Sequence, residues 1–482
     1  MPKYQTNSAQ TNSAQTGPAW DVVLDVRAVG TGTLHERLKR ALRAAIRSGR
    51  VPTGATLPSS RALAADLGCS RWAVTEAYAQ LTAEGYLEAR TGSGTRVRWV
   101  DTPHPAEVDV SRAGRAPVRM DLAPGLPDLR AFPRARWAAA LRAVTANAAV
   151  TDLGYTDPFG HHELRAVLLE YLQRSRAATG SGAQLMVTTG TSPAVLRLCQ
   201  ALSAAGHRSV AVEDPGWPRL ADAVRESGLD PVPVGVDDQG LRVTDLDAQP
   251  GTRAVLTAPA HQFPRGVVLT AERRAALLGW AQRVDGLVLE DDYDAEFRYD
   301  RAPVSTMQGM DARRVVLLGS LSKTLSPALR IGWMLVPSHW ADTLRRSETT
   351  PSLPPTLDQL AFARLLTSGA YDRHLRKARR TFRVRRDLLV AELAQRLPDC
   401  EVSGVAAGLH LVVHLPEGID AAAVVRAAEA RGVHVVDLAR YRAGGSGPPA
   451  LVLGYGNIAD SVVPEAVAIL ADVVAPQRRR SR

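Results

Sequence analysis

Cysteine is scarce in this sequence of 482 residues. Its three cysteines, Cys69, Cys199 and Cys400, lie far apart, with no CxxC pair and no cluster of histidine and cysteine at the spacing of metal ligands. Such usage argues against a disulfide framework and against a zinc site, and it suits a reducing compartment. We therefore expect a cytoplasmic protein that holds no metal ion.

Long apolar runs are missing as well. No stretch approaches the roughly 18 uncharged apolar residues that a membrane-spanning helix requires, and the first residues lack the basic-then-apolar order of a signal peptide. We expect no membrane partner. The apolar share of 45% is normal for a packed globular protein, and the length allows more than one domain.

Acidic residues are in deficit, and the deficit is concentrated in one part of the chain. The whole chain has a net charge of +10, with 59 lysines and arginines against 49 aspartates and glutamates. Residues 33–98 alone contain eleven basic and five acidic residues, a local charge of +6. A high local density of positive charge is what neutralisation of DNA phosphates requires.

Residues 33–99 have the pattern of a winged helix-turn-helix domain. The spacing of apolar residues predicts three helices, the third capped by Ser70 and running from Arg71 to Glu84. A short strand, a glycine turn and a return strand follow within residues 86–98. Three helices followed by a two-stranded wing predict a DNA-binding module.

The rest of the chain divides into four parts. Residues 1–32 contain a polar QTNSA repeat and are predicted to be a disordered tail, and residues 100–118 are predicted to be a linker. From 119 to 475 helices alternate with short apolar strands, which predicts a mostly parallel α/β sheet followed, after residue 385, by a smaller α+β lobe. Residues 476–482 are predicted to be a basic tail. The expected strands are 184–188, 209–212, 254–258, 286–289, 315–318, 334–336, 409–415, 433–436 and 450–453.

One lysine stands in the setting of a cofactor anchor. The stretch GSLSKTLSPALRIGW, residues 319–333, follows an apolar strand and places Lys323 between hydroxyl residues. A lysine in this setting forms a Schiff base with pyridoxal 5'-phosphate. The acidic cluster LEDDYDAEF, residues 289–297, supports this cofactor. Asp291 is expected to pair with the ring nitrogen, and Tyr293 to hydrogen-bond the ring oxygen and lower the pKa of the imine.

A phosphorylated cofactor also needs hydrogen-bond donors and positive charge. The segment VTTGTS, residues 187–192, starts a helix whose free N–H groups and dipole attract an anion. The expected phosphate ligands are Gly190, Thr191, Ser192, Ser320 and Arg330, and Ser322 is also expected to bind the cofactor. Trp217 is expected to stack on the cofactor ring, with a place in the hydrophobic core as the alternative. His261 or Gln262 is expected to approach the ring oxygen.

The segment LPSSRALAADLGCSRWAVTEAYAQLTAEGYLEARTGSGTRV, residues 57–97, resembles the winged helix of the GntR family of regulators. The resemblance implies that two arginines contact phosphates or guanine edges, that the start of the recognition helix faces the bases, and that the wing approaches the minor groove. The implied DNA-binding residues are Arg61, Ser70, Arg71, Trp72, Thr75, Gly92 and Gly94.

With the cofactor motifs, residues 33–475 resemble the MocR/GabR subfamily of GntR regulators, in which the sensor domain is similar to a fold type I aminotransferase. GYTDPFG at 154–160 and the tripeptide Gly408–His410 belong to this resemblance. It implies a homodimer in which Tyr155 reaches the phosphate site of the neighbouring subunit. The sequence departs from the family at the phosphate loop, GTSPAV, and carries His261-Gln262-Phe263 where aminotransferases have an asparagine.

An effector with a carboxylate needs an arginine, best placed for a bidentate pair. Arg219 follows Trp217 by two residues, where family members that sense amino acids carry an arginine, and Arg440 or Arg442 is the second candidate. The alternative for each is an ordinary surface arginine.

Three functions remain open from the sequence. The first is a DNA-binding transcriptional regulator in which pyridoxal phosphate, another B6 vitamer or an amino compound controls binding to operator DNA. The second is an active aminotransferase with an accessory DNA module, and the third is a DNA-binding protein with a cofactor-free scaffold. We expect the regulator and not an enzyme, since both departures weaken the case for turnover; multiple turnovers would indicate the second function, and absence of imine absorbance the third.

Overall fold

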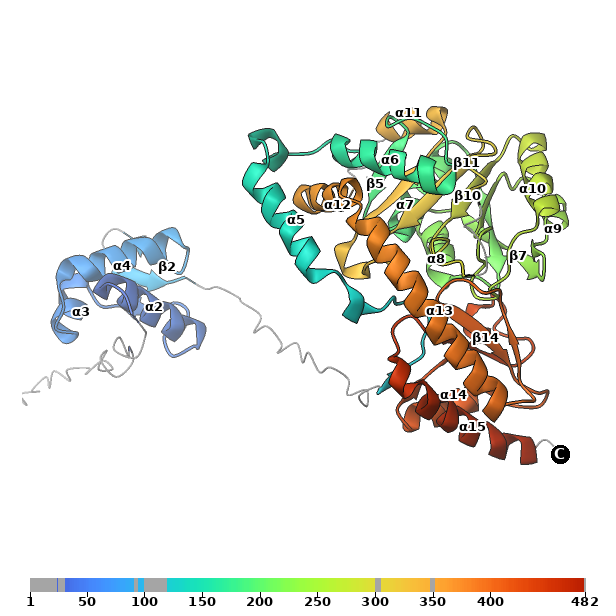
Figure 1. The fold of residues 1–482 in the computed structure, drawn as a ribbon. Helices are drawn as coiled ribbons and strands as arrows, with labels where there is room; N and C mark the ends of the chain where they lie inside the picture. The colour runs from blue at the N-terminus through green and yellow to red at the C-terminus, as the bar shows by residue number, and fades with distance from the viewer. Residues whose placement is uncertain are drawn as a thin grey trace, which may run out of the picture. The chain divides into compact units, whose positions relative to one another are not determined.

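The computed structural model describes Leu24 and residues 31–90, 94–98, 119–299, 305–346 and 352–480 (Figure 1). The chain forms two compact units, Met1–Gly114 and Arg115–Arg482. Gly92, the predicted linker and most of the predicted N-terminal tail lie outside the described residues. No helix in the described part of the chain is long and apolar enough to cross a membrane.

The N-terminal unit packs three helices against a small antiparallel sheet with the strand order β1-β3-β2. Its elements are α2 (Leu34–Arg47), β1 (Thr56–Leu57), α3 (Ser60–Asp66), α4 (Arg71–Ala83), β2 (Leu87–Arg90) and β3 (Gly94–Val97). The predicted helices and wing are thus present, and β1 is an additional strand that the sequence pattern did not indicate. One expectation is wrong: Leu24, inside the segment predicted to be a disordered tail, is only 2% exposed and packs in the core of this unit.

The second unit is built on an eight-stranded sheet with the order β5-β12-β11-β10-β9-β6-β7-β8. Neighbouring strands from β11 to β7 are parallel, while β12 is antiparallel to both of its neighbours. The prediction of a mostly parallel sheet is therefore confirmed. The strands are β5 (Leu185–Thr188), β6 (Ser209–Asp214), β7 (Asp230–Asp237), β8 (Gly240–Leu241), β9 (Ala254–Thr257), β10 (Leu287–Asp291), β11 (Val315–Ser320) and β12 (Gly332–Leu335).

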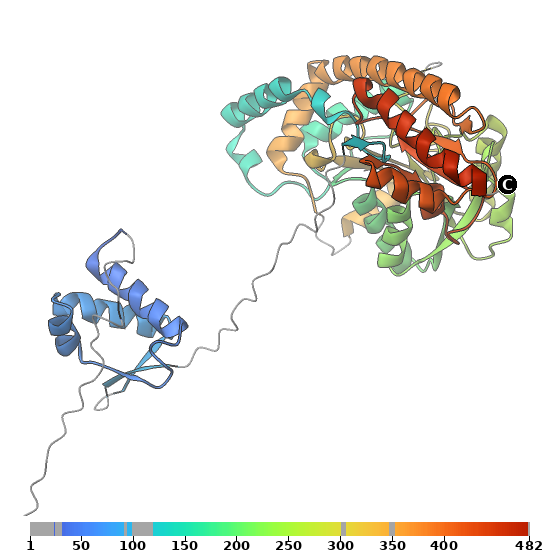
Figure 2. The same ribbon diagram turned by 90° about the horizontal axis from the view of Figure 1, so that it is seen from below.

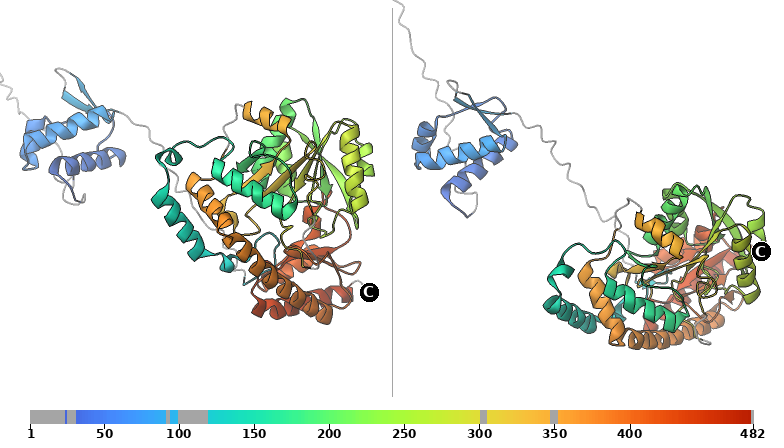
Figure 3. Two further views of the ribbon diagram at one scale, coloured as in Figure 1. Left: turned by 45° about the horizontal axis from the view of Figure 1, so that its top comes forward. Right: turned by 90° about the horizontal axis from the view of Figure 1, so that it is seen from above.

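Helices cover both faces of this sheet because its central strands are apolar on both sides (Figure 3). In β11, Val316 and Leu318 join the core beneath α7, α8 and α11, whereas Val315 and Leu317 join the cores on the opposite face. The helices of this unit up to α12 are α5 (Arg134–Asn147), α6 (His162–Arg176), α7 (Thr191–Ala204), α8 (Pro218–Glu226), α9 (Thr244–Asp247), α10 (Ala271–Arg283), α11 (Ser338–Arg346) and α12 (Thr356–Thr367).

The long helix α13 (Ala370–Arg396) leads into a smaller C-terminal α+β lobe (Figure 2). Its four-stranded sheet has the order β13-β14-β17-β16, and α13 packs beside α15. The other elements of the lobe are β13 (Glu401–Ser403), β14 (His410–His414), α14 (Ala421–Ala430), β15 (Val433–His434), β16 (Val436–Asp437), β17 (Ala450–Gly454) and α15 (Val463–Arg480).

Two expectations for this lobe differ from the structure. The predicted strand 433–436 is two short strands in different sheets, because β15 pairs with β4 (Met120–Asp121) whereas β16 pairs with β17. The predicted basic tail does not begin at residue 476, since α15 continues through Arg480.

Candidate functional site

A cleft of about 590 Å³ opens beyond the carboxyl ends of the central parallel strands. The ends of β10 and β11 and the start of α7 bring three separate motifs to its wall, as is usual for ligand sites on open α/β sheets. Ten of the predicted cofactor-binding residues line it: Gly190, Thr191, Ser192, Trp217, Asp291, Tyr293, Ser320, Ser322, Lys323 and Arg330.

Lys323 lies three residues after the end of β11, with its ammonium group inside the cleft. Its Nζ donates a hydrogen bond to the carbonyl oxygen of Gly125 at 2.6 Å and lies 5.7 Å from the centre of a Trp217 ring. Burial lowers the pKa of Lys323, although Asp294 and Asp291 oppose that shift. A lowered pKa increases the share of neutral amine, the form that attacks an aldehyde.

Asp291, at the end of β10, has a carboxylate oxygen without a hydrogen-bond partner. Its Oδ1 is buried and unbonded, and burial raises the pKa of this carboxyl to about 8, with Asp292 and Asp294 adding to the effect and Lys323 opposing it. A buried acceptor left without a donor is costly unless a ligand supplies one. The protonated nitrogen of a pyridine ring is a donor of the required kind, so this residue fits pyridoxal phosphate.

A buried ion pair fixes the loop that carries Asp291. The guanidinium of Arg176 donates to both oxygens of Asp292, from Nε at 2.8 Å and from Nη2 at 2.6 Å. On the other side of Asp291 in the chain, Glu290 accepts backbone hydrogen bonds from Met307 and Gln308, both at 3.0 Å. Both neighbours of Asp291 are thus occupied inside the protein, which leaves Asp291 to face the cleft.

The phosphate side of the cleft is formed by the start of α7 and the loop after β11. Gly190 is the N-cap of α7 and has φ +132°, so its backbone takes a course that a residue with a side chain rarely adopts. At this end the first N–H groups of a helix are unpaired and attract an anion. Arg330 is exposed and has a left-handed backbone, φ +53°, at the end of a short 3₁₀ turn. The hydroxyls of Thr191, Ser192, Ser320 and Ser322 complete the lining.

The tyrosine expected at the ring oxygen contacts a histidine. Tyr293 Oη lies 3.2 Å from Nδ1 of His261, and the same nitrogen lies 2.9 Å from Oδ2 of Asp294. His261 itself is 2% exposed and does not line the cleft. It contacts two residues that line the cleft, Tyr293 and His410, whose ring centre lies 5.0 Å away, and this differs from the expected direct approach to the ring oxygen.

Gln262 is a clear correction. Its side-chain amide is buried and donates to Glu213 Oε2 at 3.1 Å and to the carbonyl oxygens of Pro215 and Phe263 at 2.8 and 2.6 Å. These bonds turn the residue away from the cleft. Gln262 therefore supports the loop around Pro215 rather than a cofactor.

Trp217 forms a wall between two hollows. It stacks on Tyr441 with ring centres 6.0 Å apart and meets Phe263 edge-on at 5.1 Å. Of the three predicted effector arginines, only Arg219 lines the main cleft. Arg440 and Arg442 line an adjoining hollow of about 220 Å³, and Arg442 also donates to the carbonyl oxygens of Ser446 and Pro448. The three arginines do not lie in one hollow, as a single carboxylate site would require.

Tyr155 lies on the surface. Its side chain is fully exposed, and it is absent from the lining of the cleft. Two apolar neighbours, Val150 and Leu153, are 88% and 64% exposed. The segment thus presents apolar side chains to solvent, and the role of Tyr155 in a neighbouring subunit stays a prediction.

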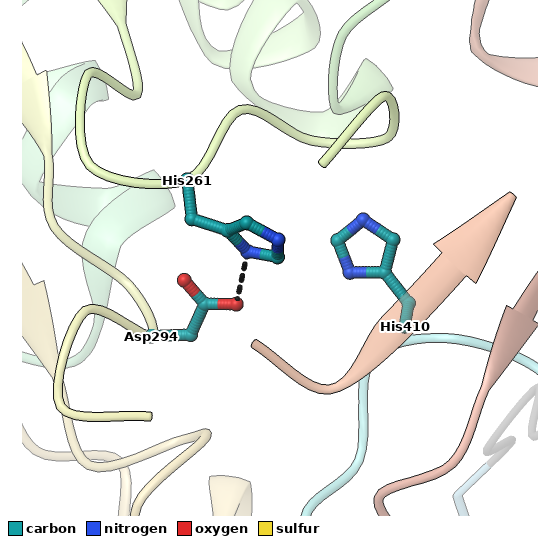
Figure 4. Close-up of side chains that lie close together, drawn as sticks. All are labelled: His261, Asp294 and His410. Carbon is teal, nitrogen blue, oxygen red and sulfur yellow. Dashed lines mark hydrogen bonds and ion pairs between the residues drawn. The ribbon is translucent and has the colours of Figure 1, made fainter. Parts of the chain in front are cut away.

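Sequence reasoning missed Asp294 and Gly125 as parts of the site and did not assign a role to His410. Asp294, His261 and His410 come from three distant segments and meet beside Tyr293, all of them buried (Figure 4). The acidic cluster after β10 contained the signal for Asp294. Nothing in the local sequence indicated Gly125. A Cβ atom built on this glycine would lie 3.6 Å from Lys323 Nζ, so the two residues are close neighbours.

In the N-terminal unit the predicted DNA-contacting side chains gather around the start of α4. Ser70 caps this helix through a bond from the Ala73 N–H at 3.3 Å, and the Thr75 hydroxyl donates to the Arg71 carbonyl oxygen at 2.9 Å. Trp72 is 65% exposed and meets His35 edge-on. Exposed side chains of the predicted set are Arg61, Arg71, Trp72 and Thr75, and Gly94 has φ +84°.

Comparison with known families and structures agrees with this arrangement. Residues 34–97 match the bacterial regulatory proteins of the gntR family, and residues 118–450 match aminotransferase class I and II. An archaeal alanine:glyoxylate aminotransferase superposes with a TM-score of 0.68 at 26% identity, covering 74% of this chain and 91% of that one. The fold of the second unit is therefore that of pyridoxal phosphate-dependent aminotransferases.

Two relatives are similar over both units. The probable rhizopine catabolism regulatory protein MocR of Rhizobium meliloti is 33% identical over 459 residues, which cover 90% of this chain and 92% of the relative. The pyridoxine biosynthesis transcriptional regulator PdxR of Corynebacterium glutamicum is 30% identical over 447 residues, covering 92% and 96%. The chain belongs to the MocR-type subfamily of GntR transcriptional regulators, with an aminotransferase-like domain following its winged helix-turn-helix.

Proposed function

We propose that this regulator binds pyridoxal phosphate in the cleft around Lys323, and that the occupant of the cleft controls binding of the winged helix domain to operator DNA. The observation that carries the proposal is the unpartnered buried oxygen of Asp291 in the same cleft as the amine of Lys323. An amine, a buried acceptor and a helix N-terminus lining one cleft match the aldehyde, ring nitrogen and phosphate of one ligand.

When bound, pyridoxal phosphate supplies an aldehyde with which a lysine amine condenses, and an aromatic ring that withdraws electrons. Lys323 offers the amine, and its hydrogen bond to Gly125 holds the nitrogen in place. Asp291 accepts the hydrogen of the ring nitrogen. Trp217 offers an aromatic face beside the amine. The phosphate ligands are the start of α7 with Ser320, Ser322 and Arg330.

The effector we propose is an amino compound, or a B6 vitamer, that enters the same cleft. The amine of such a compound would compete with Lys323 for the aldehyde and would leave the lysine as a free amine. The exposed guanidinium of Arg219 at the cleft wall would bind a carboxylate. Arg440 and Arg442 bound a second hollow beyond Trp217, which suits an extension of a longer effector.

The domains we propose are 33–99 for DNA binding and 119–475 for sensing, with a homodimer as the acting species. A dimer gives Tyr155 and its exposed apolar neighbours a partner. DNA contacts are proposed for Arg61 and Arg71 at phosphates or guanine edges, and for Ser70, Trp72 and Thr75 near the bases. The wing residues Gly92 and Gly94 are proposed to approach the minor groove.

The test is a measurement of coupling in both directions. Operator sites are first found by a genome-wide footprint of the bound protein. The affinity for operator DNA is then measured with and without pyridoxal phosphate and candidate amino compounds, and the affinity for pyridoxal phosphate with and without operator. Because allosteric coupling is reciprocal, pyridoxal phosphate should change the affinity for operator DNA by the same factor by which operator DNA changes the affinity for pyridoxal phosphate. Complete independence of the two affinities would overturn the proposal, and repeated turnover of an amino-acid and keto-acid pair would indicate an enzyme instead.

A further inference from the structure

We propose that His261, held by Asp294, is a positioning residue that turns the hydroxyl proton of Tyr293 into the cleft. The proposal rests on the proposed function, since the oxygen of the pyridoxal phosphate ring is the acceptor that this proton would meet. It assigns a role to two buried residues that line no part of the cleft.

The first step is the location of the hydrogen on His261. Its Nδ1 lies 2.9 Å from Asp294 Oδ2, as the dashed line in Figure 4 marks. A carboxylate oxygen is the acceptor of this contact, so the hydrogen is assigned to Nδ1. The same Nδ1 lies 3.2 Å from Tyr293 Oη. The single N–H is therefore shared between the carboxylate and the tyrosine oxygen, a three-centre arrangement.

The opposite nitrogen of His261 supports this tautomer. Nε2 is buried and has no hydrogen-bond partner, so a hydrogen placed there would be an unsatisfied donor. His410 is the nearest ring, with its centre 5.0 Å away, and its Nε2 lies 3.1 Å from the carbonyl oxygen of Pro264. Since that carbonyl accepts, His410 donates to it and is already oriented. Burial, and then the nearby His261, hold the pKa of His410 well below its usual value, which keeps this ring neutral.

The second step is the direction of the tyrosine proton. Burial, followed by Asp294 and Asp291, raises the pKa of Tyr293 well above its ordinary value, so the phenol keeps its hydrogen. The carboxylate of Asp294 is a competing acceptor for this proton, and a hydrogen bond to it is among the causes of the raised pKa of Tyr293. The His261 N–H contacts both that carboxylate and the phenol oxygen, and so directs the O–H bond to the cleft, which Tyr293 lines. Without the histidine donor, the carboxylate of Asp294 becomes the best acceptor available and draws the phenol proton away from the cleft. The ionisable groups around Tyr293 are Glu213, His261, Asp291, Asp294, Lys323 and His410.

The test uses the visible absorbance of the full-length protein loaded with pyridoxal phosphate, followed against pH. A hydrogen bond donated to the ring oxygen stabilises the deprotonated chromophore and lowers the midpoint of the titration. We expect His261→Phe to raise that midpoint by about one pH unit, the size expected for loss of a hydrogen bond to a charged group. In a Tyr293→Phe background, His261→Phe should cause no further shift, because its effect acts through the tyrosine hydroxyl.

Two further variants separate positioning from a structural effect. His261→Asn keeps a side-chain N–H donor and should shift the midpoint less than His261→Phe. His434→Asn is the control. His434 Nδ1 lies 3.1 Å from Asp121 Oδ1, and neither residue lines the cleft, so this variant should leave the midpoint unchanged. An equal shift from His261→Phe in both tyrosine backgrounds, or no shift in either, would overturn the proposal.

A readout without pyridoxal phosphate separates this proposal from the proposed function. Nitrogen-15 NMR of the protein with labelled histidine should show His261 with hydrogen on Nδ1, its signal identified by its loss in His261→Phe. Hydrogen on Nε2 would overturn the positioning role. If the wild-type protein instead develops no visible band with pyridoxal phosphate, the proposed function fails, and the tautomer measurement still decides the state of His261.

Discussion

Lys323 and Asp291 share one cleft, and burial moves their pKa values toward each other. Burial lowers the pKa of the amine and raises the pKa of the carboxyl to about 8. The lysine donates a hydrogen bond to the carbonyl oxygen of Gly125, and Asp291 Oδ1 has no hydrogen-bond partner. A buried amine and a buried carboxyl that do not pair with each other cost stability, and such a cost is typical of sites built for a ligand.

Lys323→Ala tests the amine directly. We expect the visible absorbance that pyridoxal phosphate gives with the wild-type protein to be lost completely, because no other lysine lines the cleft among the described residues. Where pyridoxal phosphate changes the affinity for operator DNA, the variant should need at least a tenfold higher concentration of pyridoxal phosphate for the same change. This corresponds to a loss of about 1.4 kcal/mol in binding free energy. Lys377→Ala, which removes an exposed lysine on α13, is the control and should behave as wild type. An unchanged visible band in Lys323→Ala would contradict this role.

Asp291→Asn gives a pH-dependent change in stability. The pKa of an aspartate in an unfolded chain is about 3.9, whereas the pKa of Asp291 in the folded protein is about 8. The folded protein therefore binds this proton more tightly than the unfolded chain does. The resulting stability is full below about pH 4 and is lost as pH rises to about 8. Asparagine carries no charge to bury, so the variant without cofactor should unfold about 1–2 °C higher than wild type at pH 8 to 9, roughly 1 kcal/mol in a unit of this size.

Thermal unfolding from pH 4 to 9, recorded for both proteins without pyridoxal phosphate, measures this effect. The difference should shrink toward zero at the acid end. Asp222→Asn changes an exposed aspartate at the cleft rim and serves as the control. A difference that stays constant across the pH range would show that the charge of Asp291 is not its cause. The same Asp291→Asn variant should bind pyridoxal phosphate more weakly.

At the scale of elements, the site depends on where strands end and helices begin. Gly332, the first residue of β12, passes against the backbone of Gly190 at the start of α7. A Cβ atom on Gly332 would lie 2.7 Å from the Cα of Gly190. Because this neighbour is a backbone atom, a change of side-chain rotamer cannot relieve the clash. The position of the phosphate loop is therefore set by the lack of a side chain on a neighbouring strand.

Gly332→Ala should move the start of α7 and weaken the phosphate site. Overpacking of this kind costs about 1–3 kcal/mol, so we expect roughly tenfold or weaker affinity for pyridoxal phosphate, together with a lower unfolding temperature. Fluorescence or absorbance titration measures the affinity. Gly182→Ala is the matched control, since a Cβ there meets nothing within 4 Å. Equal affinities in the two variants would show that the two glycines at this crossing do not set the loop.

The elements that the sequence predicted well are those with strong local signals. The buried strands β9, β10 and β11 are short, continuous apolar runs, and α4 begins at a serine that caps it in the structure. The strand β7 was missed because Pro231 and Pro233 lie within it and obscure the apolar pattern. The split of the predicted strand 433–436 depends on which distant partner each half meets, β4 or β17, and no local pattern records that choice.

In the site as well, the residues that belong to local motifs were predicted correctly, and those that depend on distant contacts were not. Lys323, Asp291 and the start of α7 follow directly from motifs at strand ends and were placed in the cleft as predicted. Gln262 was misplaced because three hydrogen-bond acceptors, one on Glu213, hold its amide inside the protein. The contact of His261 with Asp294 and His410 joins residues up to 149 positions apart, and only the fold brings them together.

At the scale of the whole molecule, one feature of the chain stays without a partner in a single copy. Tyr155 is fully exposed, and Val150 and Leu153 beside it expose apolar side chains to solvent. Burying such a surface against a second copy would remove this cost, and a two-fold axis would repeat the contact in both directions. Each cleft would then consist of Lys323 from one subunit and Tyr155 from the other.

A mixed dimer tests this arrangement. Subunits with Lys323→Ala and subunits with Tyr155→Ala are co-expressed with different tags, and the mixed dimer is purified through both. If Tyr155 acts across the interface, one of the two clefts contains both an intact Lys323 and an intact Tyr155, whereas the other contains neither. Titration should then give wild-type affinity for pyridoxal phosphate at half of the wild-type stoichiometry, while each homodimer binds at least tenfold more weakly, a loss of about 1.4 kcal/mol. If Tyr155 instead served its own subunit, no cleft of the mixed dimer would be complete and tight binding would be absent.

Tyr155→Phe paired with Lys323→Ala refines the result, because the phenyl ring keeps the apolar contact and any remaining loss of affinity belongs to the hydroxyl group.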